Sequence, residues 1–144
     1  MKKGGFTLIE LLVVISIIGL LATLAVVSFG NARAKARDAR RLADTAQMRK
    51  AIELYYLDNN EYPNVCAPFT GCSADDLAAV LEPNYLPHLP VDPVNSGSLV
   101  YRYAHNPLLP DSYGLLIPLE TGTTCKTGRD VKDGWWSTSP YCDF

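Results

Sequence analysis

The chain lacks the residue patterns that catalysis usually needs. It shows no nucleophile–base arrangement, no glycine-rich phosphate loop and no pair of carboxylates with a plausible cleft. Its two histidines, His88 and His105, are isolated, and we expect each to be a loop or surface residue rather than a catalyst. Neither a C-x-x-C pair nor a His/Cys ligand spacing occurs, so a zinc site is not expected. The sequence therefore favours a role that is not enzymatic.

An excess of positive charge is also missing. The 144 residues carry a formal net charge of −2, so no global basic field indicates a nucleic-acid partner. Basic residues do gather at one place, between Arg33 and Arg41. They could grip anionic lipid headgroups or DNA phosphates. Because Asp38 and Asp44 are interleaved with or follow them, we favour a solvated helix face with local ion pairs.

Charge of either sign is absent from Leu11 to Phe29. As a helix, these 19 residues would span roughly 28 Å, about one hydrocarbon core. The run is too long for the apolar region of a signal peptide, and no small-residue cleavage site follows it. We therefore predict a membrane-spanning helix that stays in the mature protein. Lys2 and Lys3 favour a cytoplasmic amino terminus, whereas the basic residues after the span favour the opposite orientation.

One carboxylate, Glu10, lies at the start of this apolar run. By chemistry alone it could reach the headgroup level, as a charged side chain at a membrane edge often does. The order Gly4-Gly5-Phe6-Thr7-Leu8-Ile9-Glu10, followed by the apolar run, resembles the processing and assembly signature of type IV pilins and type II secretion pseudopilins. The resemblance covers about the first 30 residues.

This resemblance implies how the amino terminus is used. A membrane prepilin peptidase would cut between Gly5 and Phe6 and methylate the new amine of Phe6. Glu10 would then pair with the Phe6 amine of a neighbouring subunit during filament assembly, which fits the tolerance of buried charges for an opposite partner. Loss of the leader would leave 11 basic and 15 acidic side chains, a balance of −4. Many type IV pilins carry a proline near the position of Val27. This chain has none, so Gly19 and Gly30 are the only local places where the helix could unwind.

The expected function follows from the same signature. The resemblance implies a structural subunit that polymerises through its apolar helix into an extracellular type IV pilus, or else a pseudopilin of a type II secretion or DNA-uptake machine. Its expected partners are other copies of itself, the prepilin peptidase, an assembly motor with its platform, and the membrane before assembly. The precursor would cross the cytoplasmic membrane once with its head outside, and an assembled copy would be extracellular.

Helix is predicted to continue well beyond the apolar run. Residues Ala32–Leu57 contain no proline or glycine and are rich in helix formers, so Phe6–Leu57 could form one helix roughly 78 Å long. Two stripes at helical spacing lie about half a turn apart. The bulkier one (Met48, Ala51, Ile52, Tyr55) is expected to pack on the head of the same subunit. The alanine-rich one (Ala39, Leu42, Ala43, Ala46) would allow other helices to approach, although both could instead wrap a single domain.

The remaining residues predict a small α+β head. We divide the chain into a leader (1–5), an assembly helix (6–30), an amphipathic half (31–57) and a head (58–144). Ser73–Asp76 reads as a capping box that opens a helix to about Glu82. Leu99–Ala104 and Tyr113–Leu119 read as antiparallel strands, and Gly134–Thr138 as a third. The phrase Leu89–Asn95 again resembles pilin and pseudopilin heads. The expected fold is a long helix on a small antiparallel sheet, with a lollipop shape.

Four cysteines suit an oxidising compartment and allow three pairings. We favour Cys66–Cys72 and Cys125–Cys142, because each closes a loop within one segment, and buried free thiols are the alternative. No cofactor is expected. Glu120, Asp130 and Asp133 could supply oxygen ligands to calcium, which is a minor alternative because the tail does not closely match the calcium loop that the resemblance implies. Aromatic residues of the tail (Trp135, Trp136, Tyr141, Phe144) are expected to fill the core rather than form a sticky surface.

Overall fold

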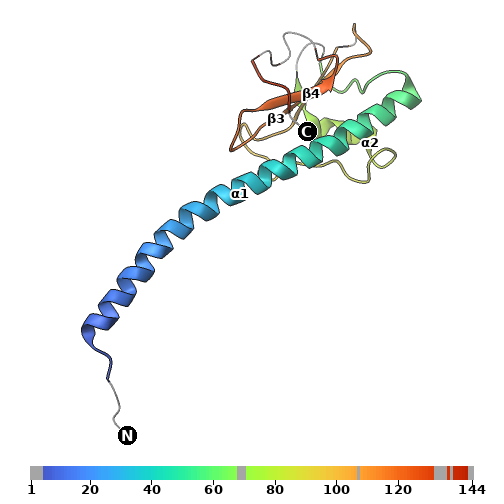
Figure 1. The fold of residues 1–144 in the computed structure, drawn as a ribbon. Coiled ribbons are helices and arrows are strands. Elements are labelled where there is room, and N and C mark those ends of the chain that lie inside the picture. The colour runs from blue at the N-terminus through green and yellow to red at the C-terminus, as the bar shows by residue number, and fades with distance from the viewer. Residues whose placement is uncertain (1–4, 68–70, 107, 132–135, 137, 143–144) are drawn as a thin grey trace.

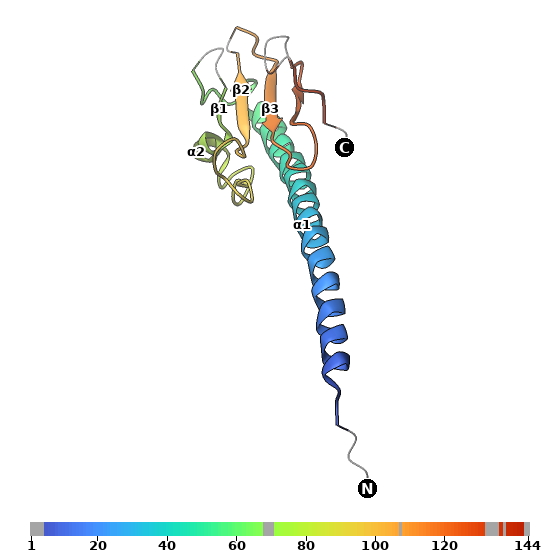
Figure 2. The ribbon, with the colours of Figure 1, turned by 90° about the vertical axis from the view of Figure 1, so that its left-hand side faces the viewer.

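The structure is a computed structural model, and it describes residues 5–67, 71–106, 108–131, 136 and 138–142, with the backbone alone for residues 25–28. One long helix forms a stem that carries a small head on its carboxy-terminal half (Figures 1 and 2). Helix α1 (Leu8–Asn59) is 52 residues long. The predicted length is therefore confirmed, but the helix lies two residues further along than the predicted range 6–57.

Both ends of α1 have clear local causes. Thr7 is the N-cap, and its side chain and that of Glu10 form a reciprocal capping box. Asn60 ends the helix in the left-handed conformation (φ 56°), and its N–H donates to the carbonyl of Tyr56 at 2.8 Å. No break occurs at Gly19 or Gly30, since the backbone between these caps is helical throughout.

Among the residues that the structure describes, the head contains four antiparallel strands, a short 3-10 helix and a single α-turn. The strands are β1 (Cys72–Ser73), β2 (Arg102–His105), β3 (Tyr113–Ile117) and β4 (Cys125–Arg129), and they lie in that order across the sheet. Between β1 and β2 come the 3-10 helix η1 (Ala74–Leu77) and the single α-turn α2 (Ala78–Leu81). Ser73 caps η1 by accepting from the N–H of Asp75 at 3.3 Å. The predicted α+β fold is confirmed.

The core lies between α1 and the sheet. Met48, Ala51 and Ile52 of α1 are fully buried, as are Leu115 and Ile117 of β3. Full burial of each large apolar side chain contributes about 1.5–3 kcal/mol. These contacts confirm that the stripe from Met48 to Tyr55 packs on the head of its own subunit. On the other stripe, Ala39, Ala43 and Ala46 are exposed, and Leu42 is half-buried against the core.

Several predictions within the head were wrong. Strand β2 begins at Arg102 rather than Leu99, and β3 ends at Ile117, before Pro118. The strand β4 was missed, because CKTGR has little β propensity and forms a strand only by pairing with β3. The two-residue β1 was missed as well. Of the predicted third strand, Trp136 and Thr138 lie in a bend and a turn, and 134, 135 and 137 are outside the described residues.

Two side chains occupy environments opposite to those expected. His105 is buried in β2, where its Nδ1 lies 3.0 Å from the carbonyl oxygen of Ser112. His88 is exposed, as predicted. Tyr141 is 61% exposed rather than part of the core, because it lies beside Lys126 at the sheet edge. Trp136 is half-buried, and Trp135 and Phe144 are outside the described residues.

Candidate assembly site

The site begins at the amino-terminal cap of α1, where the chain presents one carboxylate. Glu10 Oε2 accepts hydrogen bonds from the N–H of Thr7 at 2.8 Å and from the Thr7 hydroxyl at 2.7 Å. The N–H of Glu10 donates back to that hydroxyl at 3.2 Å. The carboxylate is therefore held one residue away from the peptide nitrogen of Phe6. A carboxylate accepts about four hydrogen bonds, and Thr7 supplies only two.

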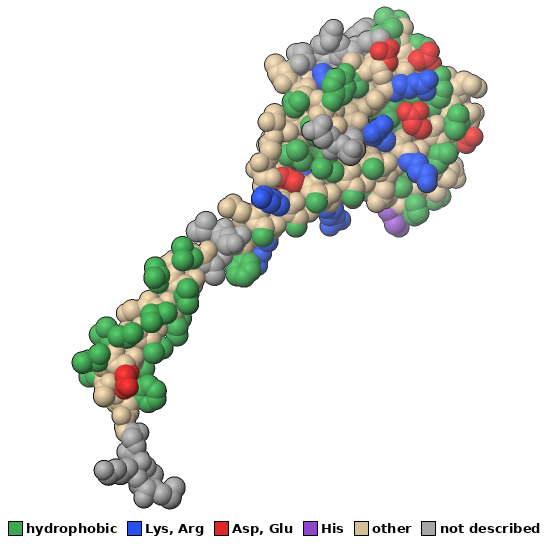
Figure 3. Space-filling model, viewed as in Figure 1, with side chains coloured by type: hydrophobic (Ala, Val, Ile, Leu, Met, Phe, Trp, Pro, Cys, Tyr) green, Lys and Arg blue, Asp and Glu red, His purple; other side chains and the backbone are tan. Residues whose placement is uncertain are grey.

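The apolar run beyond the cap is uncovered. Large side chains from Leu11 to Leu24, and then Phe29, are exposed to the surroundings of the stem, and Figure 3 shows apolar side chains along its amino-terminal half. By length and composition α1 can cross a membrane, and none of its apolar window is buried within the subunit. An apolar surface of this extent marks a membrane or protein contact. Ser16 and Thr23 do not interrupt it, because their hydroxyls donate to Leu12 and Leu20 carbonyls, both at 2.7 Å.

At the base of the head, Arg41 and Arg37 have a different role from the one expected. The guanidinium of Arg41 is fully buried and forms a bidentate pair with Asp92, with Nε–Oδ2 at 2.6 Å and Nη2–Oδ1 at 3.0 Å. Its Nη1 also donates to Asp38 at 2.8 Å and to Glu120 at 2.6 Å. A second bidentate pair joins Arg37 to Glu120, with Nε–Oε1 at 2.7 Å. We call these five residues the Arg41 cluster.

The Arg41 cluster joins three distant segments. Asp38 accepts hydrogen bonds from the backbone N–H groups of Glu120 and Thr121, so a helix side chain holds the loop between β3 and β4. Asp92 accepts from the N–H groups of Val94 and Asn95, and so shapes the long loop before β2. The expected solvated face is wrong for Arg41 and holds for Arg40, whose side chain is 66% exposed. No sequence signal marked Arg41, although Asp92 lies in the phrase Leu89–Asn95.

Electrostatics keep the acids of the cluster ionised. Hydrogen bonds from Arg37 and then Arg41 lower the pKa of Glu120 to about 2. Burial opposes the ionisation of Asp92, but hydrogen bonds from Arg41, Val94 and Asn95 outweigh it and hold its pKa below the ordinary value. Asp38 behaves similarly, because hydrogen bonds from Glu120, Thr121 and Arg41 exceed the effect of burial on its pKa. The bond with Asp92 raises the pKa of Arg41.

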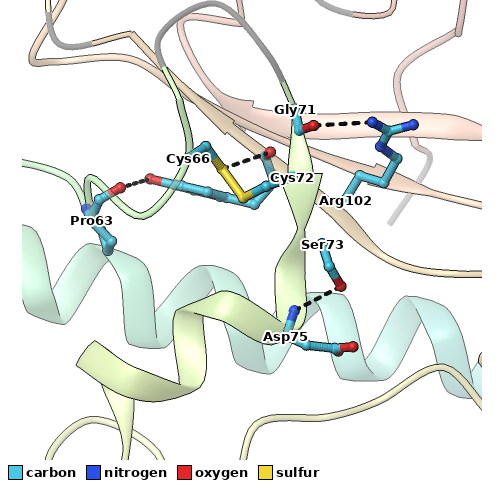
Figure 4. The surroundings of a disulfide bond; sticks show 8 residues. Pro63, Cys66, Gly71, Cys72, Ser73, Asp75 and Arg102 are labelled. Atoms are coloured by element: carbon cyan, nitrogen blue, oxygen red, sulfur yellow. Dashed lines mark hydrogen bonds between the residues drawn. A yellow bond between two sulfur atoms is a disulfide. The ribbon is translucent and has the colours of Figure 1, made fainter.

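Two disulfides anchor the two outer strands of the sheet, β1 and β4. Cys66 pairs with Cys72 of β1, and Cys142 pairs with Cys125 of β4. These are the two pairings favoured from the sequence. Figure 4 shows the first of them, with Ser73 reaching Asp75 and Arg102 donating to the carbonyl of Gly71 at 3.0 Å. In the same region the hydroxyl of Tyr103 donates to the carbonyl of Pro63 at 2.9 Å. These bonds fix the loop that follows α1 against β2.

Of the three calcium candidates, the structure describes only Glu120 and Asp130. Glu120 is held by Arg37 and Arg41, and Asp133 is outside the described residues. Over the described ranges, no three His, Cys, Asp or Glu side chains are grouped as a metal ion would require. The expectation of no cofactor, with calcium as its minor alternative, therefore stays a prediction.

Fold and site together define a class: a subunit with a long apolar stem, a capped carboxylate at its start and a small α+β head. Residues 1–26 match the family model described as the prokaryotic N-terminal methylation motif. The type II secretion system core protein G of Vibrio cholerae is 32% identical over 97% of this chain and 96% of that protein. The corresponding protein of Aeromonas hydrophila is 27% identical over the same shares.

A second kind of relative matches a shorter stretch. The type IV major fimbrial protein FimA of Dichelobacter nodosus is 40% identical over 51% of this chain and 47% of FimA. No solved structure matches the chain. The chain belongs to the family of type IV pilins and type II secretion pseudopilins. Its amino-terminal motif is that of a prepilin, and the protein is a filament subunit.

Proposed function

We propose that this subunit is cut between Gly5 and Phe6, methylated on the Phe6 amine, and polymerised into a type IV pilus through α1. The observation that carries this proposal is the uncovered apolar run with a capped carboxylate at its start, within the matched motif. Before assembly the run would lie in the cytoplasmic membrane, with the head and its disulfides on the outer side. An assembly motor on its platform would then move the subunit out of the membrane.

In the filament, Glu10 would receive the Phe6 amine of a neighbouring copy. The geometry supports this pairing, because Glu10 lies next to the position where cleavage would create the new amine. A positive amine offsets the cost of moving a carboxylate into an apolar bundle. Packing between apolar helices, rather than removal of apolar surface from water, would hold the filament together, because the run leaves lipid and not water.

A second candidate machine is supported by a specific observation. The relatives that match nearly the whole chain are type II secretion proteins, whereas the fimbrial relative matches about half of it. The alternative is therefore a pseudopilin of a type II secretion or DNA-uptake system. Electron microscopy of filaments sheared from cells separates the two, since a pilus extends far beyond the envelope and a pseudopilus does not.

The pairing of Glu10 is tested with two substitutions that differ in one respect. Glu10→Gln keeps an oxygen that can accept from Thr7 but removes the charge, whereas Glu10→Val removes both. We expect both precursors to lose their leader, which mass spectrometry of the amino terminus detects together with the methyl group on Phe6. Both should assemble at least tenfold less filament. Filament yield at the wild-type level with Glu10→Gln would show that capping, and not charge pairing, is what assembly needs.

A further inference from the structure

An apolar seam runs along α1 and continues onto the head-bearing half of the helix. Its members are spaced alternately by four and three residues over five heptads. They are Leu11, Ile15, Ile18, Ala22, Ala25, Phe29, Ala32, Ala36, Ala39, Ala43 and Ala46. Every member whose side chain the structure describes is exposed. A repeat of 3.5 residues is the spacing that lets a second helix follow the first one closely.

The seam positions carry no charge even in the part of α1 that is rich in charged residues. Eight ionisable residues lie between Gly30 and Lys50, and none of them occupies a seam position (Arg33, Lys35, Arg37, Asp38, Arg40, Arg41, Asp44, Arg49). A straight helix drifts about 20° per heptad from such a repeat, so the five heptads amount to about 100°. A neighbouring helix would therefore have to cross with a left-handed twist. The absence of charge along the whole line is what a helix partner needs.

A groove opens beside this seam at the base of the head. It has a volume of about 250 Å³ and lies between Leu42 of α1, Leu119, Thr123 and the disulfide Cys125–Cys142, with Tyr141 at its side. None of the described residues that line it is charged. On a helical wheel Leu42 is about 40° from Ala46 and 60° from Ala39, so the groove borders the seam. An apolar cavity of about 150 Å³ accommodates benzene, so this groove has room for a phenyl ring.

We propose that this groove receives Phe29 from a second copy of the chain, whose α1 packs along the seam. Phe29 is the one large side chain at a seam position beyond Ile18, and it is 64% exposed. All copies enter the membrane in the same orientation, so the two helices are parallel. A shift of two heptads, about 21 Å along the axis, keeps the seam in register and places Phe29 of one copy level with Ala43 and Leu42 of the other.

This proposal rests on the filament function proposed above and names the contact between stem and head within it. The alanines opposite Phe29 leave space for its ring, as a large knob needs small neighbours. The groove offers that ring an apolar wall on the head side. The seam therefore serves two environments in turn: its first part contacts lipid before assembly, and its second part guides the head of a neighbour into place.

A photo-crosslinking experiment tests the contact in the whole protein. Benzoylphenylalanine replaces Tyr141, which is exposed at the side of the groove, and the matched control replaces Leu57, which is 72% exposed on α1 away from the groove lining. Filaments are irradiated beside the same chain kept monomeric in detergent. We expect the Tyr141 probe to give a covalent dimer in filaments at least tenfold above the monomer sample. Mass spectrometry should find the acceptor in the α1 peptide that contains Phe29.

Other outcomes of that experiment overturn the proposal. If filaments form but the dimer joins head to head, or no dimer appears, the groove has another neighbour and the assignment is wrong. If the unsubstituted chain forms no filament in any condition, the proposed function fails and this contact fails with it. As a second measurement, Thr123→Trp should fill the groove and lower filament yield at least tenfold while the head melts within a few degrees of wild type. Leu57→Trp is its control, and equal yields for the two variants would contradict the proposal.

Discussion

Replacing Arg41 by methionine is expected to destabilise the head without changing the apolar stem. Arg41 is fully buried and is the only cation that contacts Asp92 among the hydrogen bonds and ion pairs of the described residues. Removing one partner of a buried ion pair costs about 3–5 kcal/mol, because the remaining charge has lost its compensation. For a domain of this size each kcal/mol lowers the melting temperature by about 4–8 °C. We therefore expect a fall of more than about 10 °C.

The assay is near-ultraviolet circular dichroism of the full chain in detergent. Buried tyrosines such as Tyr103 and Tyr113 report on the head, whereas the helical signal at shorter wavelengths is dominated by α1. The matched control is Arg40→Met, one residue away. The Arg40 side chain is 66% exposed and lies 3.6 Å from Asp44, a buried acid that also accepts a hydrogen bond from the Tyr101 hydroxyl. Because the Arg40 guanidinium is in solvent and Asp44 keeps its bond with Tyr101, this variant should lose much less stability than Arg41→Met.

A double-mutant cycle isolates the contribution of the pair between Arg41 and Asp92 to stability. Asp92→Asn keeps an oxygen for the N–H groups of Val94 and Asn95 but removes the charge that faces Arg41. If the pair is the cause, Arg41→Met combined with Asp92→Asn should cost clearly less than the sum of the single changes, with a coupling above about 1 kcal/mol. Equal losses for Arg41→Met and Arg40→Met, or strictly additive effects with Asp92→Asn, would refute the reasoning.

Three further predictions concern pH, a disulfide and a glycine. The folded pKa of Glu120 (about 2) and those of Asp38 and Asp92 lie below their ordinary values, so the cluster stabilises the head fully above roughly pH 5 and loses that contribution as the pH falls toward 2. Acid titration of the wild type and of Arg41→Met checks this, because the stability of the variant should fall less steeply with pH. Cys125→Ser with Cys142→Ser should cost about 3 kcal/mol in denaturant unfolding, and no loss would contradict the loop-closure argument. Gly128→Ala should destabilise the head strongly, because its φ is 149° and a Cβ would lie 2.2 Å from the carbonyl of Tyr113, whereas Gly122→Ala meets only ordinary contacts and should melt like wild type.

Local sequence signals predicted the stem well. The length of α1 and its continuation past the apolar run follow from residues close in the chain, and its end lies within two residues of the predicted Leu57. The two disulfides also join residues within single segments. In each case the physical cause, whether helix propensity, capping or loop closure, acts over a short stretch and can be read there.

Features that depend on distant residues could not be predicted in the same way. Arg41 lies in a basic run that resembles a solvated face, and its burial depends on acids 51 and 79 positions further along the chain. Strand β4 has the composition of a loop and is a strand because β3 offers it a partner. His105 and Tyr141 were misplaced for the same reason, since their exposure is set by the neighbouring strands rather than by their own residue type.

The position of the Arg41 cluster has a mechanical consequence. Asp38 and Arg41 lie where the stem enters the head, and from there they bind the loops that flank both sides of the sheet. Tension applied to the stem would therefore reach the head through these ionic bonds as well as through the apolar core. A subunit drawn by its stem would thus be held to its head partly by charge, and strong acid would weaken that part of the connection.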